Sequence, residues 1–135
     1  MKKNIDQQIL LDKITSLASE DDDIEVIWLY GSRSQGSYHS NSDFDLAVAF
    51  KNFDLSVNDK FLRPNLLTIE WAYELGIEED KLSIVDVNTI PIYLAFNVVE
   101  YGTVLYQADT TRCIHEANRI YSQYEYQLIE SQQND

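Results

Sequence analysis

Two aspartates separated by one residue, Asp43 and Asp45, stand at the start of an alternating apolar segment. Residues two apart on a strand project from the same face, with Cα atoms about 6.6 Å apart. Two carboxylates this close raise each other's pKa unless a cation lies between them. A pair of divalent cations bound there could clamp a phosphate during in-line displacement. The alternative is a solvated pair with no chemical role.

A glycine–serine turn precedes the pair, with Gly31 and Ser32 followed by ten residues and then Asp43. Gly31 directly follows an apolar run, and glycine lets the backbone turn and approach a ligand closely. Ser32 and Arg33 come where a strand-to-helix turn exposes backbone N–H groups to an anion. We therefore predict that Gly31, Ser32 and Arg33 bind nucleotide phosphates, although a solvated turn with Arg33 on the surface is also compatible with the pattern.

Apolar periodicity predicts the elements that position these residues. In the segment 42–50, alternate residues face opposite sides of a strand, and both aspartates share the face of Ala47 and Ala49. The alternation of strands and helices predicts an α/β (α+β) protein with a small mixed sheet flanked by helices. We expect a single domain, 1–135, with its core at about 24–106. The expected strands are 24–30, 42–50, 82–88 and a short edge strand at 103–106, and the expected helices are 4–19, 64–75, 91–100 and 111–130.

Composition and charge exclude several classes of protein. The chain has 135 residues, 44% hydrophobic and 24% charged, which is typical of a globular domain. No apolar run approaches the roughly 20 residues of a membrane span, so we expect a cytoplasmic protein. The single cysteine, Cys113, excludes an internal disulfide and a thiolate zinc cluster.

The net charge of −13 argues against a long nucleic-acid footprint, because neutralising phosphates needs clustered Lys and Arg. An acidic protein can still bind a nucleotide through divalent cations, or dock on a basic protein. Among the tyrosines, Tyr121, Tyr124 and Tyr126 near the C-terminus are candidates for an interface.

The order Gly31–Ser32, ten residues, then Asp43–Phe44–Asp45 resembles the signature of the nucleotidyltransferases related to DNA polymerase beta. The chain is similar in length to the minimal nucleotidyltransferases found beside HEPN-domain toxins in bacteria and archaea. The stretch IVDVNTIPIYLAFNVVEYGTVLY, residues 84–106, is similar to the downstream region of that group. The resemblance covers about residues 24–106.

This resemblance implies a nucleotidyltransferase fold and a third carboxylate on a strand after a helix, which corresponds to Asp86 in KLSIVDVN. An unpaired carboxylate is costly inside an apolar strand. Asp86 would then join Asp43 and Asp45 as catalytic residues and metal ligands. The alternative is a strand-end aspartate that caps the helix starting near Pro91.

The resemblance also implies the reaction and the partner. It implies two Mg²⁺ ions, ATP as co-substrate, and AMP transfer to a tyrosine of a cognate HEPN RNase toxin, which makes the chain an antitoxin. One alternative is an antitoxin that acts only by binding its toxin. Another is a nucleotidyltransferase that acts on a small molecule such as an antibiotic.

Overall fold

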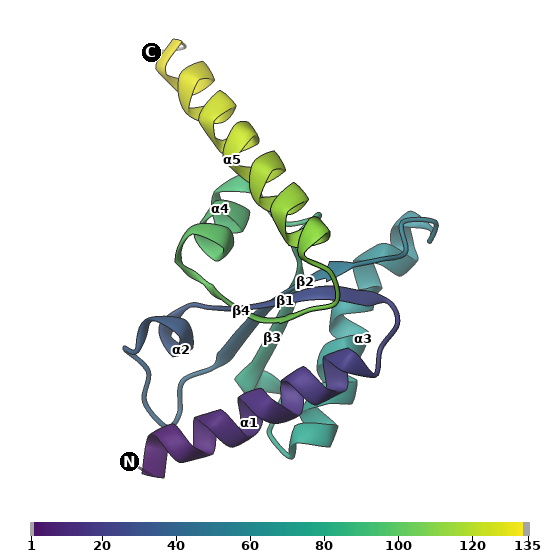
Figure 1. Cartoon of the computed structure of the whole chain (residues 1–135), viewed down its shortest axis with the longest axis vertical. Coiled ribbons are helices and arrows are strands. Elements are labelled where there is room, and N and C mark those ends of the chain that lie inside the picture. The colour runs from purple at the N-terminus through teal and green to yellow at the C-terminus, as the bar shows by residue number, and fades with distance from the viewer. Residues whose placement is uncertain (1, 134–135) are drawn as a thin grey trace.

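The protein is a sheet between two layers of helices (Figure 1). The computed structural model describes residues 2–133. In chain order the elements are α1 (Lys2–Ser19), β1 (Ile24–Tyr30), α2 (Ser32–Gln35), β2 (Phe44–Phe50), α3 (Val57–Leu75), the 3-10 turn η1 (Glu79–Lys81), β3 (Leu82–Asp86), α4 (Ile92–Tyr101), β4 (Thr103–Gln107) and α5 (Thr110–Gln133). None of these helices is long and apolar enough to cross a membrane.

The four strands form one mixed sheet in the order β3-β2-β1-β4. β1 pairs antiparallel with both β2 and β4, while β2 and β3 run parallel. The predicted mixed sheet flanked by helices is confirmed, and the short strand near 103–106 is indeed an edge strand. The start of β2 and the end of β1 meet at one end of the sheet, since Tyr30 pairs with Asp45.

Each face of the sheet has its own hydrophobic core. Phe44, Leu46, Val48 and Phe50 pack on one side with residues of α1 and α3. Ala47 and Ala49 pack on the other side with residues of α4 and α5. The period-two alternation read from residues 42–50 is therefore confirmed, and it assigns Asp45 to the face covered by α4 and α5.

Several element boundaries differ from the sequence prediction. The strand predicted to start at residue 42 begins at Phe44, which leaves Asp43 on the loop before it. The helix predicted to start at Pro64 begins at Val57, because the Ser56 side chain caps it by accepting the Asp59 N–H at 3.1 Å. Pro64 is buried inside α3. The strand predicted to reach residue 88 ends at Asp86, because the chain turns there and the Thr89 N–H donates to the Asp86 carbonyl.

The base of α5 is fixed to the sheet by a buried carboxylate. Glu116 accepts Nε–H bonds from Arg112 at 2.9 Å and Arg119 at 2.8 Å, and an amide bond from Asn88 at 3.0 Å. Burial alone would raise the pKa of Glu116, but these hydrogen bonds and the Arg119 charge outweigh it and hold the pKa below its ordinary value.

The C-terminal part of α5 extends past the rest of the molecule (Figure 1). Tyr124 stacks on Phe96 at 3.8 Å, and the Tyr121 hydroxyl donates to Glu100 at 2.7 Å. These two tyrosines thus serve the packing of α5 on α4. Tyr126 is exposed, so of the three it remains the freest candidate for an interface.

Candidate active site

The turn after β1 touches the second aspartate of the pair. Gly31 has φ 74° and ψ −156°, a conformation that essentially only glycine adopts. A Cβ built on Gly31 would lie 2.6 Å from Asp45 Oδ2, closer than real Cβ atoms come to their neighbours. The glycine is therefore required twice, for its backbone conformation and for the space that the Asp45 carboxylate occupies.

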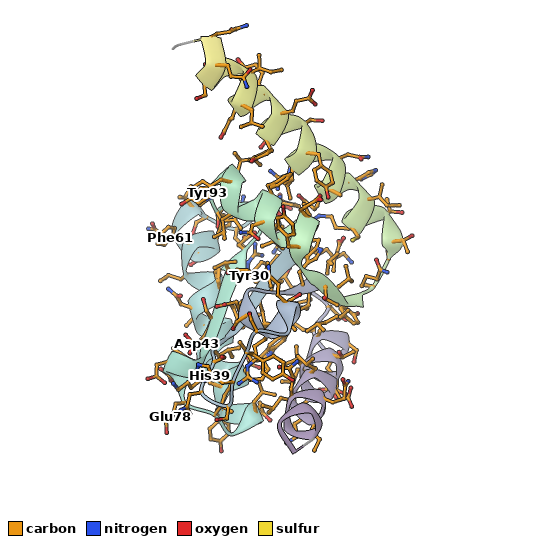
Figure 2. All side chains as sticks on the ribbon, turned by 90° about the vertical axis from the view of Figure 1, so that its left-hand side faces the viewer. Tyr30, His39, Asp43, Phe61, Glu78 and Tyr93 are labelled. Carbon is orange, nitrogen blue, oxygen red and sulfur yellow. The ribbon has the colours of Figure 1, made fainter. Side chains whose placement is uncertain are left out.

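Asp43 and Asp45 lie close enough to interact electrostatically. Asp43 is exposed on the loop just before β2, and Asp45 is half-buried on β2. Burial, and then the Asp43 charge, raise the pKa of Asp45. Burial and the Asp45 charge raise the pKa of Tyr30 to about 12. Figure 2 faces this end of the sheet, with Asp43 and Tyr30 labelled. The arrangement concentrates negative charge, which a cation would stabilise.

Ser32 is the first residue of the short helix α2. The N–H groups of Ser34 and Gln35 donate to the Gly31 carbonyl, so the hydrogen bonds within α2 begin at its third residue. The Ser34 and Thr103 hydroxyls hydrogen-bond at 3.0 Å, which ties α2 to the start of β4. The Gly31–Ser32 turn is thus tied to β4, and Ser32, which follows Gly31 in the chain, is half-buried.

Arg33 is a buried side chain, 8% exposed, so it is not the surface residue that the sequence pattern also allowed. Its guanidinium donates to the Ser42 carbonyl at 2.8 Å and to Gln7 Oε1 at 3.2 Å, and it stacks 4.1 Å from the Phe44 ring. Burial lowers its pKa. Arg33 therefore fixes the loop that leads into Asp43, and we do not retain it as a phosphate ligand.

Asp86 is not brought to the aspartate pair. In the parallel register it lies beside Val48, three residues along β2 from Asp45, which corresponds to about 10 Å. Because Val48 faces α1 and α3, Asp86 lies on the opposite face of the sheet from Asp45.

The contacts of Asp86 explain why a carboxylate is tolerated there. It is 3% exposed, accepts the Asn88 N–H at 2.9 Å and lies 3.6 Å from the Arg63 guanidinium. Burial outweighs these contacts and raises its pKa. The carboxylate thus stabilises the turn after β3 and pairs with Arg63, so we do not retain it as a metal ligand.

Ser83 is the residue that the sequence reasoning missed. It pairs with Asp45 across the parallel strands β2 and β3, so both side chains project from the same face. Ser83 is exposed, so its side chain lies outside the core, on the strand beside Asp45. The sequence does contain a sign of this position. Ser83 lies between the apolar residues Leu82 and Ile84, so an alternating strand would turn it to the opposite, more polar face.

The residues present fit magnesium that is held partly by the phosphates of a bound substrate. Among residues 2–133, no group of three or more His, Cys, Asp and Glu side chains is placed to hold a metal ion. Mg²⁺ is usually bound by one or two carboxylates plus substrate phosphates and water, rather than by an all-protein cage. Asp43 and Asp45 supply two such carboxylates beside a turn suited to phosphate.

Comparisons with known proteins agree with this geometry. The family model described as Polymerase beta, Nucleotidyltransferase matches residues 12–111. The protein adenylyltransferase MntA of Aphanizomenon flos-aquae (strain 2012/KM1/D3) is 29% identical over 86 residues, 62% of this chain and 57% of that protein. The match thus spans little more than half the length of this relative.

Solved structures show the same fold. A chain of a toxin–antitoxin with AMP-PNP has a TM-score of 0.69 and 27% identity, covering 90% of this chain and 92% of that one. A chain of a mutant of the toxin–antitoxin MntA–HpeT has a TM-score of 0.66 and 26% identity, covering 90% of each chain. The similarity extends well beyond the turn and the two aspartates.

Proposed function

Because the chain belongs to the Polymerase beta, Nucleotidyltransferase family, we propose that it transfers AMP from ATP to a tyrosine of a HEPN toxin and thereby neutralises the toxin. The observation that carries this proposal is the contact between the Asp45 carboxylate and the Gly31 turn. This contact joins carboxylates suited to a divalent cation with a turn suited to phosphate.

Each residue has a defined task in this proposal. The Gly31–Ser32 turn holds the β- and γ-phosphates, with the Ser32 hydroxyl and the turn's N–H groups as donors. Asp43 and Asp45 would hold two Mg²⁺ ions, and such ions would neutralise the charge of the triphosphate and of the leaving pyrophosphate. Arg33 keeps Asp43 in place through the Ser42 carbonyl. Catalysis here consists mainly of positioning and charge stabilisation.

The reaction balances as a single displacement at phosphorus. The tyrosine oxygen forms a bond to the α-phosphorus of ATP, and the bond from that phosphorus to the β-phosphate oxygen breaks. Pyrophosphate leaves with the electron pair of the broken bond, and the phenolic proton passes to water. The product is AMP esterified to the tyrosine.

The relatives and the charge of the chain support the donor and the acceptor. One similar structure is of a toxin–antitoxin with AMP-PNP, an ATP analogue, and the matched relative from Aphanizomenon is named a protein adenylyltransferase. An RNase needs basic residues to bind the RNA backbone. A chain of net charge −13 is complementary to such a toxin, and complementary charge speeds encounter.

The test is AMP transfer measured on the intact toxin. The purified chain, MgATP and its HEPN-domain partner are incubated, and mass spectrometry follows the addition of AMP units to the toxin. We expect addition with the native chain and none with the double variant Asp43→Asn, Asp45→Asn. Asp86→Asn is the matched control, because it removes a carboxylate from the opposite face and should leave transfer intact in the folded protein.

Two results would contradict the proposal. Absence of AMP on the toxin with the native chain would exclude the transferase. Full neutralisation of the toxin by the double variant would show an antitoxin that acts by binding alone.

A further inference from the structure

The outer face of α3 carries a stripe of large apolar side chains with no neighbour among the described residues to cover it. The stripe consists of four exposed side chains: Leu62 (50% exposed), Leu66 (63%), Ile69 (51%) and Tyr73 (84%). Their spacings of four, three and four residues place them on one side of the helix. The residues that α3 buries lie on the opposite side, against the sheet.

This spacing is the pattern of a helix–helix seam. Apolar residues alternately three and four apart form the line along which two helices interlock. The stripe runs for about 16 Å, or three helical turns. A hollow of about 340 Å³ lies beside its first half, lined in part by Leu62 and Leu66. A seam with a hollow beside it can receive the side chains of a second helix.

The rim of this hollow is acidic. Asp21, Asp59 and Glu70 line it together with Asp23 and Arg63. The Arg63 charge is already balanced, since its guanidinium lies 3.0 Å from Asp23 and 3.6 Å from Asp86. The remaining carboxylates leave one flank of the stripe negative, so a helix docked there would be favoured by basic residues on that flank.

We propose that the outer stripe of α3 docks an amphipathic helix of the partner protein, with an apolar seam on the stripe and Lys or Arg facing Asp59 and Glu70. The inference rests on the proposed function for the partner, the HEPN toxin. A second copy of this chain fits less well, because each copy has a net charge of −13 and would bring its own acidic flank to the contact.

The stripe lies apart from the catalytic residues. α3 covers the face of the sheet opposite to the one that carries Asp45, and the first half of the stripe borders Phe50, at the other end of β2. The stripe would therefore hold the toxin without taking part in chemistry.

The test measures affinity for the toxin by calorimetry. We expect the double variant Leu66→Gln, Ile69→Gln to raise the Kd tenfold or more, because apolar anchors dominate interface energies. The matched control is Phe61→Gln, which removes an apolar side chain that is 73% exposed on another side of the same helix. It should change Kd less than about twofold. Unchanged circular dichroism and melting temperature verify the fold of each variant.

A charge-reversed variant tests the occupant's chemistry. Asp59→Lys with Glu70→Lys should lower the association rate several-fold at low salt and flatten its salt dependence. An association rate that these substitutions leave unchanged would contradict the proposal that basic residues of the partner face Asp59 and Glu70. If the chain alone forms a dimer, and the double variant Leu66→Gln, Ile69→Gln dissociates that dimer, the stripe binds a second copy of the chain and not the toxin.

The inference and the proposed function fail in different ways. If AMP is transferred but the stripe variants bind the toxin as tightly as the native chain, the docking surface is wrong and the function stands. If the stripe variants bind the toxin more weakly but the native chain transfers no AMP, the proposed function is wrong and the docking surface stands.

Discussion

Alanine at Gly31 should separate the two roles of that glycine. The backbone at φ 74° and ψ −156° would cost an alanine about 1–3 kcal/mol of stability. The new Cβ, 2.6 Å from Asp45 Oδ2, must reach ordinary contact at 3.4 Å or more, so the carboxylate moves by about 0.8 Å. Since a displacement of about 1 Å can cost about 100-fold in rate, we expect AMP transfer by Gly31→Ala to fall about 100-fold.

The matched control is Gly36→Ala. Gly36 also has a positive φ, 79°, but no heavy atom lies within 4 Å of the position of its Cβ. We expect a loss of about 1 kcal/mol and nearly native activity. The assays are the rate of AMP incorporation into saturating toxin and the melting temperature of each variant. Equal loss of activity in the two variants, or full activity of Gly31→Ala, would refute the reasoning from the Asp45 contact.

Three further outcomes follow from the contacts around the sheet. Ser83→Asp adds a third carboxylate beside Asp45, so it should tighten Mn²⁺ binding several-fold by calorimetry and destabilise the metal-free protein; unchanged affinity would contradict the register argument. Arg33→Gln removes the bonds to the Ser42 carbonyl and should cost about 2–4 kcal/mol in denaturant unfolding while slowing AMP transfer; native transfer rates would rule out its positioning role. Glu116→Gln should destabilise the protein at neutral pH by about 1–3 kcal/mol, because it weakens the hydrogen bonds from Arg112 and Arg119. Because the folded pKa of Glu116 is lowered, that stabilisation is present above the unfolded pKa and is lost as pH falls through the folded pKa, so the melting temperatures of the native chain and Glu116→Gln should converge in acid.

Most of the sheet could be predicted from the sequence because its strands have strong periodicity. The alternation in residues 42–50 correctly divides Phe44 and Leu46 from Ala47 and Ala49. The start of α3 was missed although a local signal exists, since Ser56 and Asp59 have the spacing of a helix cap. Pro64 pointed to a first turn instead, because proline is most common there.

The site was harder to predict, because it depends on register between strands distant in sequence. Asp86 is two residues from Ile84 and four from Leu82, so strand alternation places it on an apolar face. Only its pairing with Val48 shows that this face packs against α1 and α3. The burial of Arg33 depends on how the loop 36–43 folds back over it, and no local pattern encodes that.

The guanidinium of Arg33 links two parts of the chain that share no strand pairing. Gln7 in α1 exchanges two hydrogen bonds with Arg33, one through each end of its amide, while the same arginine holds the carbonyl next to Asp43. The first helix, which contributes no carboxylate to the pair, thereby helps to set where that carboxylate stands. A movement of α1 would therefore be transmitted to Asp43 through the Arg33 side chain.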